Sequence, residues 1–427
     1  MELTMTKTDN EKLTRFIREQ RNRAKSEDLP LSDIRVIDLS TVVAAPFAAT
    51  LLGDMGAEVI KVENPTMPDA LRAWGVIPEK GIQPFWSVIG RNKFPVTINL
   101  KAPEGKEILT RLVEKSDVLI DNMRPGTLDK LGFNIDTLLR LNPGLIVGKI
   151  SGYGQTGPYS QRPGFGTLAE AYSGFTYLNA QPGGVPTNPP MALADYIAGL
   201  HLTFAVAVAL KNQKRGEKGG QVIDVSLYEP LFGLLGPDFL SYFLTGNVPQ
   251  ATGNELSYAA PRNTYRTQDQ QWAAMSCSAQ KPFERLMDCV GRPDLIKDPR
   301  FLSNDIRSKP ENRAVLNEVI SDWIGTRDLK DVLETCDRLE VTVGPITTMK
   351  DIDQDPHYKE RGSLMEIEDP ATGTRLRMPD VPFRLSGSPG RIRFPGLPHG
   401  SANTVIYEDL LGYAPEKIEK LREAKAI

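Results

Sequence analysis

Basic side chains recur near the ends of several predicted strands. Each one alone is typical of a solvated surface charge, but a group of cations beside free backbone amides at loop ends suits a phosphorylated ligand. The residue pattern by itself therefore favours a site for a nucleotide-like anion and does not identify the ligand. The cations are Arg91, Lys93, Lys101, Arg124 and Lys130.

A glycine-rich segment, residues 152–157, follows the predicted strand at 145–150 and fits the pattern G-x-G-x-x-G. A dinucleotide-binding fingerprint requires a helix that opens at the third glycine, so that its N-terminus meets the pyrophosphate. Here Pro158 follows the third glycine, and an acidic residue about twenty positions further on is lacking. The glycines therefore predict a turn that lines a cleft rather than a nicotinamide site.

Short apolar segments alternate with helical patterns through the first half of the chain. This alternation predicts a doubly wound α/β domain with a parallel sheet, in which ligands gather beyond the carboxyl ends of the strands. Strands are expected at 34–39, 57–63, 96–100, 117–121, 145–150 and 221–227, and helices at 44–56, 103–115, in part of 127–142, and at 195–211.

The length of 427 residues exceeds that of a usual single domain. We expect a charged N-terminal extension at 1–28 that forms a surface helix, a large Rossmann-like domain at 29–229 and a small α+β domain at 230–345. The C-terminal segment, 346–427, is expected to return to the large domain.

The composition excludes several classes of protein. A net charge of −3 gives no pull toward nucleic acid or anionic membranes. The chain has no secretory signal and no apolar run of membrane-spanning length, so a cytoplasmic protein is expected. The three cysteines and three histidines are scattered without metal-ligand spacing, and no metal site is predicted.

Several ordered segments resemble the class III CoA-transferases. They run in the family's order over most of residues 31–230, which makes chance similarity very improbable. The segments are 35–40, 51–63, 91–93, 122–128, 151–159, 194–199 and 219–227.

The resemblance implies a Rossmann-like large domain, a small domain and two chains that thread through each other as an interlocked dimer. It also implies coenzyme A or acyl-CoA as a substrate, with no permanently bound cofactor. The positions that match the family's CoA contacts are Val43, Ala44, Asn64, Ile98, Asn99, Lys101, Asn122, Met123, Arg124, Lys130, Ser151 and Tyr153.

Transferases of this family use one aspartate as a nucleophile, in a Pro-Asp-Gly-Pro-Pro turn twelve residues before the aspartate matched here by Asp195. Gly183 occupies that position, so the resemblance implies that this chain has no catalytic nucleophile of its own. We expect Asp195 to cap the helix that it opens. In the related racemase branch a histidine assists this aspartate, but Phe165 replaces it here, and Glu170 reads as an exposed helical position.

Three functions stay open. The favoured one is a heteromeric transferase, in which a homologous partner subunit supplies the aspartate and CoA passes from a dicarboxylic acyl-CoA such as succinyl-CoA to an organic acid, with 2-benzylsuccinate as one candidate. The others are a self-sufficient homodimeric transferase and a CoA-binding scaffold. Phe165, Tyr172, Phe175 and Tyr177 would suit an aromatic acid, although core packing is the preferred interpretation.

Overall fold

The structure is a computed structural model that describes residues 7–26, 29–214 and 219–427. The chain forms two compact units. The first comprises residues up to 175, 189–237 and 359–427, and the second comprises 176–188 and 238–358. The chain therefore crosses between the units four times, and each unit is described by itself.

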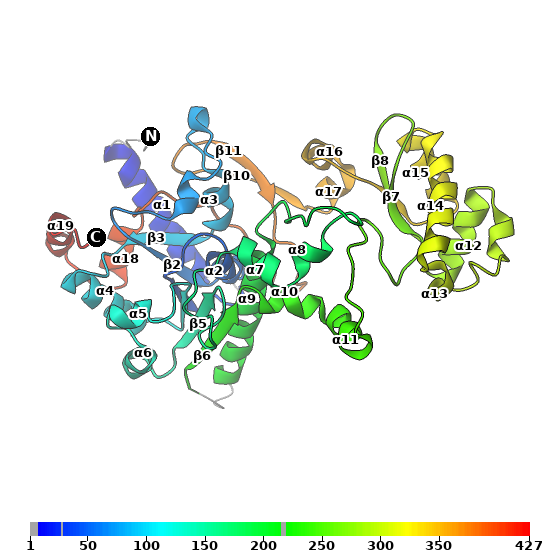
Figure 1. Cartoon of the computed structure of the whole chain (residues 1–427). Helices are drawn as coiled ribbons and strands as arrows, with labels where there is room; N and C mark the ends of the chain where they lie inside the picture. Colours follow the sequence, from blue (N-terminus) through cyan, green and yellow to red (C-terminus); the bar gives the residue numbers. More distant parts are fainter. Residues whose placement is uncertain (1–6, 27–28, 215–218) are drawn as a thin grey trace. The chain divides into compact units, whose positions relative to one another are not determined.

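A six-stranded parallel sheet organises the first unit, in the order β3-β2-β1-β4-β5-β6 (Figure 1). The order reverses between β1 and β4, which pair with Val36 opposite Val118. Apolar runs form these strands because both faces of a parallel sheet are covered by helices. The strands are β1 (Arg35–Asp38), β2 (Glu58–Glu63), β3 (Lys93–Thr97), β4 (Val118–Asp121), β5 (Ile146–Ser151) and β6 (Gln221–Ser226).

Alternate residues of the strands enter two separate cores. Ile37 and Ile60 belong to one core, whereas their neighbours Val36 and Val59 belong to the other, as the alternation of side chains along a strand requires. The first core contains α1 (Lys7–Ser26), α4 (Pro103–Val113), α5 (Thr127–Lys130), α6 (Ile135–Leu141), α18 (Asn403–Asp409) and α19 (Pro415–Glu423). The second contains α2 (Ala44–Asp54), α7 (Gly166–Tyr172), α9 (Leu193–Lys214) and α10 (Glu229–Leu234).

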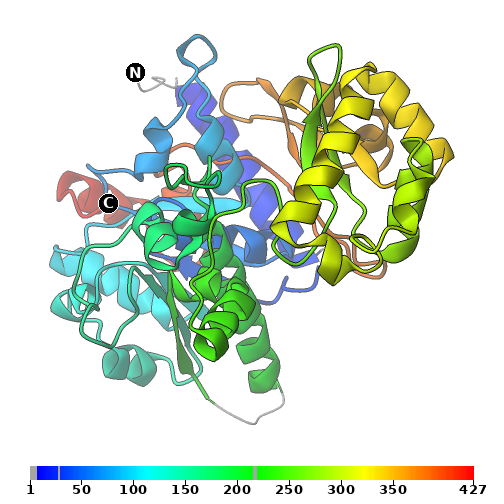
Figure 2. The same ribbon diagram turned by 45° about the vertical axis from the view of Figure 1, so that its right-hand side comes forward.

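The described part of the N-terminal extension, residues 7–26, is the helix α1, and it is not a simple surface helix; the rest of the predicted range 1–28 lies outside the described residues. Leu13 and Ile17 are buried in the first core, and the buried Arg21 forms an ion pair with Glu58 of β2. Because α1 also contacts α18, the two ends of the chain cover the same core (Figures 1 and 2).

The long apolar helix α9 packs against α2, β5 and β6. By length and composition it is the one helix among the described residues that is long and apolar enough to cross a membrane, a segment that was not expected from the sequence. Its buried face carries Ala198, Leu202 and Val206, as expected for a helix that lies on a sheet.

The remaining elements of the first unit are short. A two-stranded antiparallel sheet is formed by β10 (Leu364–Glu368) and β11 (Arg375–Pro379). The helices are η1 (Ala70–Ala73), η2 (Pro78–Lys80) and α3 (Pro84–Ile89).

The second unit has its own core around a three-stranded antiparallel sheet of β7 (Arg262–Arg266), β8 (Trp272–Ser276) and β9 (Val343–Pro345). Cys277 and Cys336 are buried there as free thiols. Its helices are α12 (Gln280–Cys289), η3 (Pro293–Ile296), α13 (Asn304–Arg307), α14 (Pro310–Gly325), α15 (Leu329–Arg338), α16 (Met349–Gln354) and α17 (Pro356–Glu360). Two helices, α8 (Phe175–Leu178) and α11 (Gly236–Thr245), lie at crossings between the units.

Candidate functional site

The loops that follow β1 and β4 meet where the strand order reverses. The Asn122 side chain accepts a hydrogen bond from the backbone N–H of Thr41 at 2.9 Å and donates one to its carbonyl at 2.8 Å. Ligands of open parallel sheets bind at this reversal, beyond the carboxyl ends of the strands. Asn122 therefore lies where the sequence placed it, but both polar atoms of its side chain already bond to the neighbouring loop.

Four of the predicted contact residues have buried side chains. Val43, Ala44, Ile98 and Ser151 are at most 7% exposed. Val43 directly precedes α2, and no side chain caps the start of that helix. These residues offer a ligand mainly their backbone groups.

Two predicted asparagines shape the loops after β2 and β3. The Asn64 side chain accepts hydrogen bonds from the backbone N–H groups of Thr66 and Met67 at 2.9 and 3.1 Å. The Asn99 side chain accepts from the N–H of Lys101 at 3.1 Å. Such short-range bonds are typical of Asx turns, so both side chains organise the backbone of the site.

Three of the predicted cations are exposed near the carboxyl ends of the strands. Lys101 follows β3, Arg124 follows β4, and Lys130 lies in α5 immediately after that loop. Within the described chain, none of the three side chains forms a hydrogen bond or an ion pair. Met123, the remaining predicted residue of the β4 loop, is partly buried against the first core. The three cations are free to meet an anionic ligand.

The other two cations are structural, which corrects the prediction from sequence. Arg91 binds Asp54 through Nη2 at 2.7 Å, and Asn92 donates to the same carboxylate at 2.8 Å. Lys93 is fully buried and forms an ion pair of 2.8 Å with Asp38. These residues cannot meet a phosphate group because they lie inside the fold and hold internal carboxylates.

Two buried charged residues were not recognised from the sequence. Lys61 lies in the middle of β2, and its Nζ is 3.2 Å from Asp69, a buried residue that follows the strand. A lysine between the apolar residues of a predicted buried strand is the signal that would have found this pair, because a buried ammonium group requires a carboxylate partner.

A cluster of tyrosines, most of them partly buried, surrounds Tyr153. Its ring centroid lies 5.4 Å from that of Tyr172, which lies 5.0 Å from that of Tyr228. Phe165 is 70% exposed and Tyr172 is 51% exposed, and Tyr177 of the second unit is also exposed. The preferred interpretation of these aromatic residues as core is therefore wrong, except for Phe175, which packs partly against the second core.

Asp195 and Glu170 form a pair of carboxylates in the first unit. Burial, and then the charge of Glu170, raise the pKa of Asp195 to about 6. Its carboxylate lies against Gly166, where an added Cβ would approach Oδ2 to 1.8 Å. With a pKa near neutrality, Asp195 is suited to hold or release a proton.

Two predictions about this pair are wrong. Helix α9 begins at Leu193, so Asp195 lies within the first helical turn instead of capping it. Glu170 is buried rather than exposed, and its Oε1 accepts a hydrogen bond of 3.2 Å from the backbone N–H of Ala194. The sequence pattern of α7 did not reveal this long-range contact.

Gly183 lies in the part of the second unit formed by residues 176–188. Its φ is +69°, and a Cβ added there would meet nothing within 4 Å. The neighbouring Gly184 N–H donates to the carbonyl of Gln181 at 2.8 Å, which closes a turn. The position is open to solvent and has room for a larger side chain.

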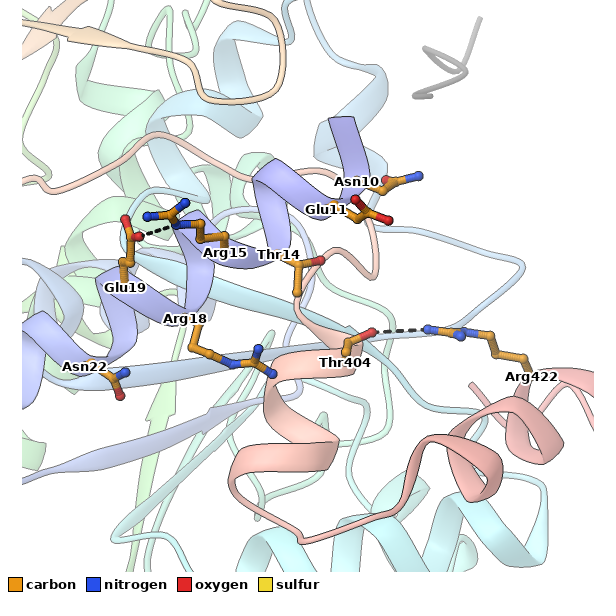
Figure 3. Close-up of a pocket in the computed structure, with 9 residues that line it drawn as sticks. All are labelled: Asn10, Glu11, Thr14, Arg15, Arg18, Glu19, Asn22, Thr404 and Arg422. Carbon is orange, nitrogen blue, oxygen red and sulfur yellow. Dashed lines mark hydrogen bonds and ion pairs between the residues drawn. The ribbon is translucent and has the colours of Figure 1, made fainter. Parts of the chain in front are cut away.

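A hollow on the first unit, between α1 and the C-terminal helices α18 and α19, also has charged walls (Figure 3). Its basic side chains are already paired: Arg15 with Glu19, Arg18 with Glu408 and Asp409, and Arg422 with Glu419. This hollow is less suited to an anion than the free cations near the strand ends.

Comparisons with known proteins identify the family. The model of CoA-transferase family III matches residues 31–404. The chain is 38% identical over 403 residues to the alpha subunit of succinyl-CoA–L-malate CoA-transferase from Chloroflexus aurantiacus, covering 94% of this chain and 93% of that protein. It is 39% identical over 401 residues to the beta subunit, covering 93% and 98% respectively.

The fold agrees with a solved structure. A crystal structure of a CAIB/BAIF family protein from Brucella suis is similar, with a TM-score of 0.78, 30% sequence identity, and coverage of 90% of this chain and 100% of that one. Together with the parallel sheet and its strand order, these matches show that the chain belongs to CoA-transferase family III.

Proposed function

We propose that this chain is one subunit of a heteromeric CoA-transferase, in which a homologous partner subunit supplies the nucleophilic aspartate. The observation that carries the proposal is the glycine at position 183, which the resemblance to the family matches with that aspartate. No carboxyl side chain occurs in the sequence between Glu170 and Asp195. A glycine has no group that attacks a thioester, so the covalent step requires another chain.

The chemistry that the partner would perform is covalent group transfer. Its carboxylate attacks the donor thioester, forming a mixed anhydride and releasing the CoA thiolate. The thiolate then attacks the carbonyl derived from the aspartate, which releases the donor acid and leaves an enzyme thioester. Repetition of these steps in reverse with the acceptor acid restores the carboxylate and yields the new acyl-CoA.

The relatives support a heteromer. This chain is similar to both the alpha and the beta subunit of a two-subunit transferase, at 38% and 39% identity. The family alone does not specify which subunit performs the chemistry. The residue at position 183 is what distinguishes the two roles in our proposal.

Exposed apolar side chains support a large interface with the partner. Leu200, Phe204 and Val208 recur at every fourth position and are all exposed on α9. The helix α11 separately exposes Phe239 and Phe243. Apolar surface of this extent is typical of a surface covered in an obligate complex, and the interlocked dimer is the arrangement that we propose for it.

The free cations support CoA binding. Lys101, Arg124 and Lys130 would meet the phosphate groups, while Tyr153 and the uncapped start of α2 lie at neighbouring loops. CoA is then a substrate that enters and leaves, and no permanently bound cofactor is required.

For the substrates, we propose succinyl-CoA as donor and a dicarboxylic acid as acceptor. The relatives are named for succinyl-CoA and L-malate. The exposed aromatic rings of Phe165 and Tyr172 favour an acceptor with an apolar substituent, such as 2-benzylsuccinate. Comparison of L-malate with 2-benzylsuccinate in the assembled enzyme tests this choice, and a preference for L-malate would exclude the aromatic acid.

The proposal is tested by measuring CoA transfer by two samples. One is the purified chain alone, and the other is its complex with a homologous subunit that carries the aspartate. We expect transfer only by the complex, because loss of a covalent nucleophile typically lowers kcat by several orders of magnitude. Transfer by the isolated chain at a rate comparable to that of the complex, or an acyl or CoA adduct on this polypeptide, would contradict the proposal.

Gly183→Asp provides a gain-of-function test, and Gly183→Asn is its matched control. Both side chains have nearly the same shape and tolerate a positive φ, but only the aspartate can form the anhydride. We expect an enzyme–CoA thioester, detected by intact mass after addition of succinyl-CoA, in Gly183→Asp alone. An adduct in both variants or in the wild type would show that another residue is attacked.

A self-sufficient homodimer and a CoA-binding scaffold are the alternative functions. The homodimer predicts activity of the chain alone. The scaffold predicts that the complex retains full activity when the three free cations of this chain are replaced by methionine.

A further inference from the structure

The loop between β1 and α2 contains a residue in an unfavourable backbone conformation. Val42 has a φ of +69°. A positive φ is uncommon for any residue with a side chain, and for a β-branched residue it is an outlier that persists only when the surroundings enforce it. The loop directly precedes Val43 and Ala44, which match CoA contacts of the family.

Three side chains fix the backbone of this loop. The Lys61 ammonium group donates to the carbonyl of Ser40. Asn122 bonds to both backbone groups of Thr41. Asp69 accepts the N–H of Val42 at 3.1 Å through Oδ1 and 3.3 Å through Oδ2. Each of three consecutive residues is therefore held by a group from a different part of the fold.

Asp69 is itself held rigidly. It is 3% exposed, its carboxylate lies 3.2 Å from the Lys61 Nζ, and it accepts the N–H of Leu71 at 3.0 Å. Its own N–H donates to Glu63 at 3.0 Å. Because Lys61 also bonds to Ser40, a single buried ion pair anchors both ends of the segment from Ser40 to Val42.

We infer that Asp69 is a positioning residue that forces Val42 into the left-handed conformation and thereby preforms the β1–α2 loop for its ligand. The identity of that ligand as CoA rests on the proposed function. Asp69 is buried and cannot touch CoA, so its influence passes through the loop backbone. Preforming a loop strengthens binding because less conformational entropy is lost when the ligand arrives.

The test uses Asp69→Asn in the full chain, within the complex in which CoA binds, and Asp54→Asn as the matched control. Asp54 is also a buried carboxylate, but its partners are Arg91 and Asn92 rather than residues of this loop. We expect Asp69→Asn to raise the Kd for CoA about 10-fold. The asparagine side chain has only one acceptor atom, so its NH2 group would face the Lys61 ammonium group or the Val42 N–H, which are both donors, and the loop would be held less firmly. The Asp54→Asn complex should bind CoA within about 2-fold of wild type.

A rescue variant separates positioning from general stability. Glycine adopts a positive φ without strain, so it needs no carboxylate to enforce the conformation. We therefore expect the double variant Asp69→Asn with Val42→Gly to bind CoA within about 3-fold of Val42→Gly alone. The inference is wrong if Asp69→Asn raises the Kd for CoA about 10-fold in the Val42→Gly background as well, as it does in the wild-type background. It is also wrong if Asp69→Asn alone leaves the Kd unchanged.

Hydrogen exchange of the wild-type complex provides a readout that requires no substitution. We expect the amides of residues 40–43 to be protected equally in the absence and presence of CoA, because the loop is already formed. Protection that develops only after CoA is added would overturn the inference. Absence of CoA binding by the wild-type chain would instead count against the proposed function, while slow exchange in the loop would still support the role of Asp69.

Discussion

Val42 and Gly183 have the same positive φ, +69°, but for opposite reasons. At Val42 a buried carboxylate, a lysine and an asparagine fix the loop, and the side chain is unfavourable for the conformation. At Gly183 the residue type permits the conformation, and no atom lies within 4 Å of an added Cβ. The comparison teaches that three side chains from elsewhere in the fold, two of them buried, hold the proposed binding loop, whereas glycine alone accommodates the turn at position 183.

The largest expected effect comes from breaking the buried network. Lys93→Met removes the nearer of the two ion-pair partners of Asp38, at 2.8 Å. It leaves only Lys61, whose Nζ lies 3.9 Å from the same carboxylate. Removal of one partner of a buried ion pair typically costs about 3–5 kcal/mol, so we expect a loss of that size in the free energy of unfolding. Urea denaturation measures it. Lys101→Met, at an exposed position, is the control and should change the stability by less than about 0.5 kcal/mol.

An intermediate effect is expected at Asp195, a carboxylate that is mostly buried but lacks the lysine that Asp69 has. Its pKa is raised from 3.8 to about 6, so the folded chain binds the proton more tightly than the unfolded chain does. The contribution of the Asp195 carboxyl group to the stability of the wild type should therefore fall as the pH rises from about 4 to about 6 and then level off.

Asp195→Asn removes this dependence. We expect the variant to gain stability relative to wild type with increasing pH, reaching about 1–3 kcal/mol above pH 6, as measured by denaturation at a series of pH values. A constant difference between the two proteins from pH 4 to pH 8 would show that the Asp195 carboxyl group titrates normally.

The smallest effect is expected at Gly183. Gly183→Ala should lower the free energy of unfolding by about 1 kcal/mol, because alanine resists a positive φ although the space is open. Gly183→Asn should cost less, since asparagine tolerates this conformation. Thermal unfolding compares the two. A loss well above 1 kcal/mol would mean that residues 176–188 cannot accept a side chain, and would weaken the gain-of-function test.

The elements of the fold were largely predictable from local patterns. The apolar runs predicted β1, β2, β4, β5 and β6. The amphipathic pattern predicted a helix at 103–115, and α4 spans Pro103–Val113. The strand β3 begins at Lys93 rather than Val96, because Asp38 neutralises a lysine that a local pattern places outside a strand. Hydrophobic periodicity indicates which face of a local element is buried. It does not indicate which charged residues form ion pairs with residues remote in sequence.

The candidate site was predictable in part. The exposed cations Lys101, Arg124 and Lys130 follow the carboxyl ends of predicted parallel strands, where the α/β pattern places a ligand site. Arg91 and Lys93 looked the same in the sequence, but Asp54 and Asp38 lie close to them only after folding. The buried position of Glu170 likewise depends on a hydrogen bond to Ala194, which belongs to another helix.

The sequence by itself determined the α/β class, the resemblance to the family and the absence of a carboxyl group at position 183, because these are properties of local pattern and residue type. Only the tertiary structure decided which charged residues are free and which are structural, and that Asp69 accepts a hydrogen bond from the backbone of Val42. Charge pairing and backbone strain depend on distances between segments remote in sequence, and folding alone sets those distances.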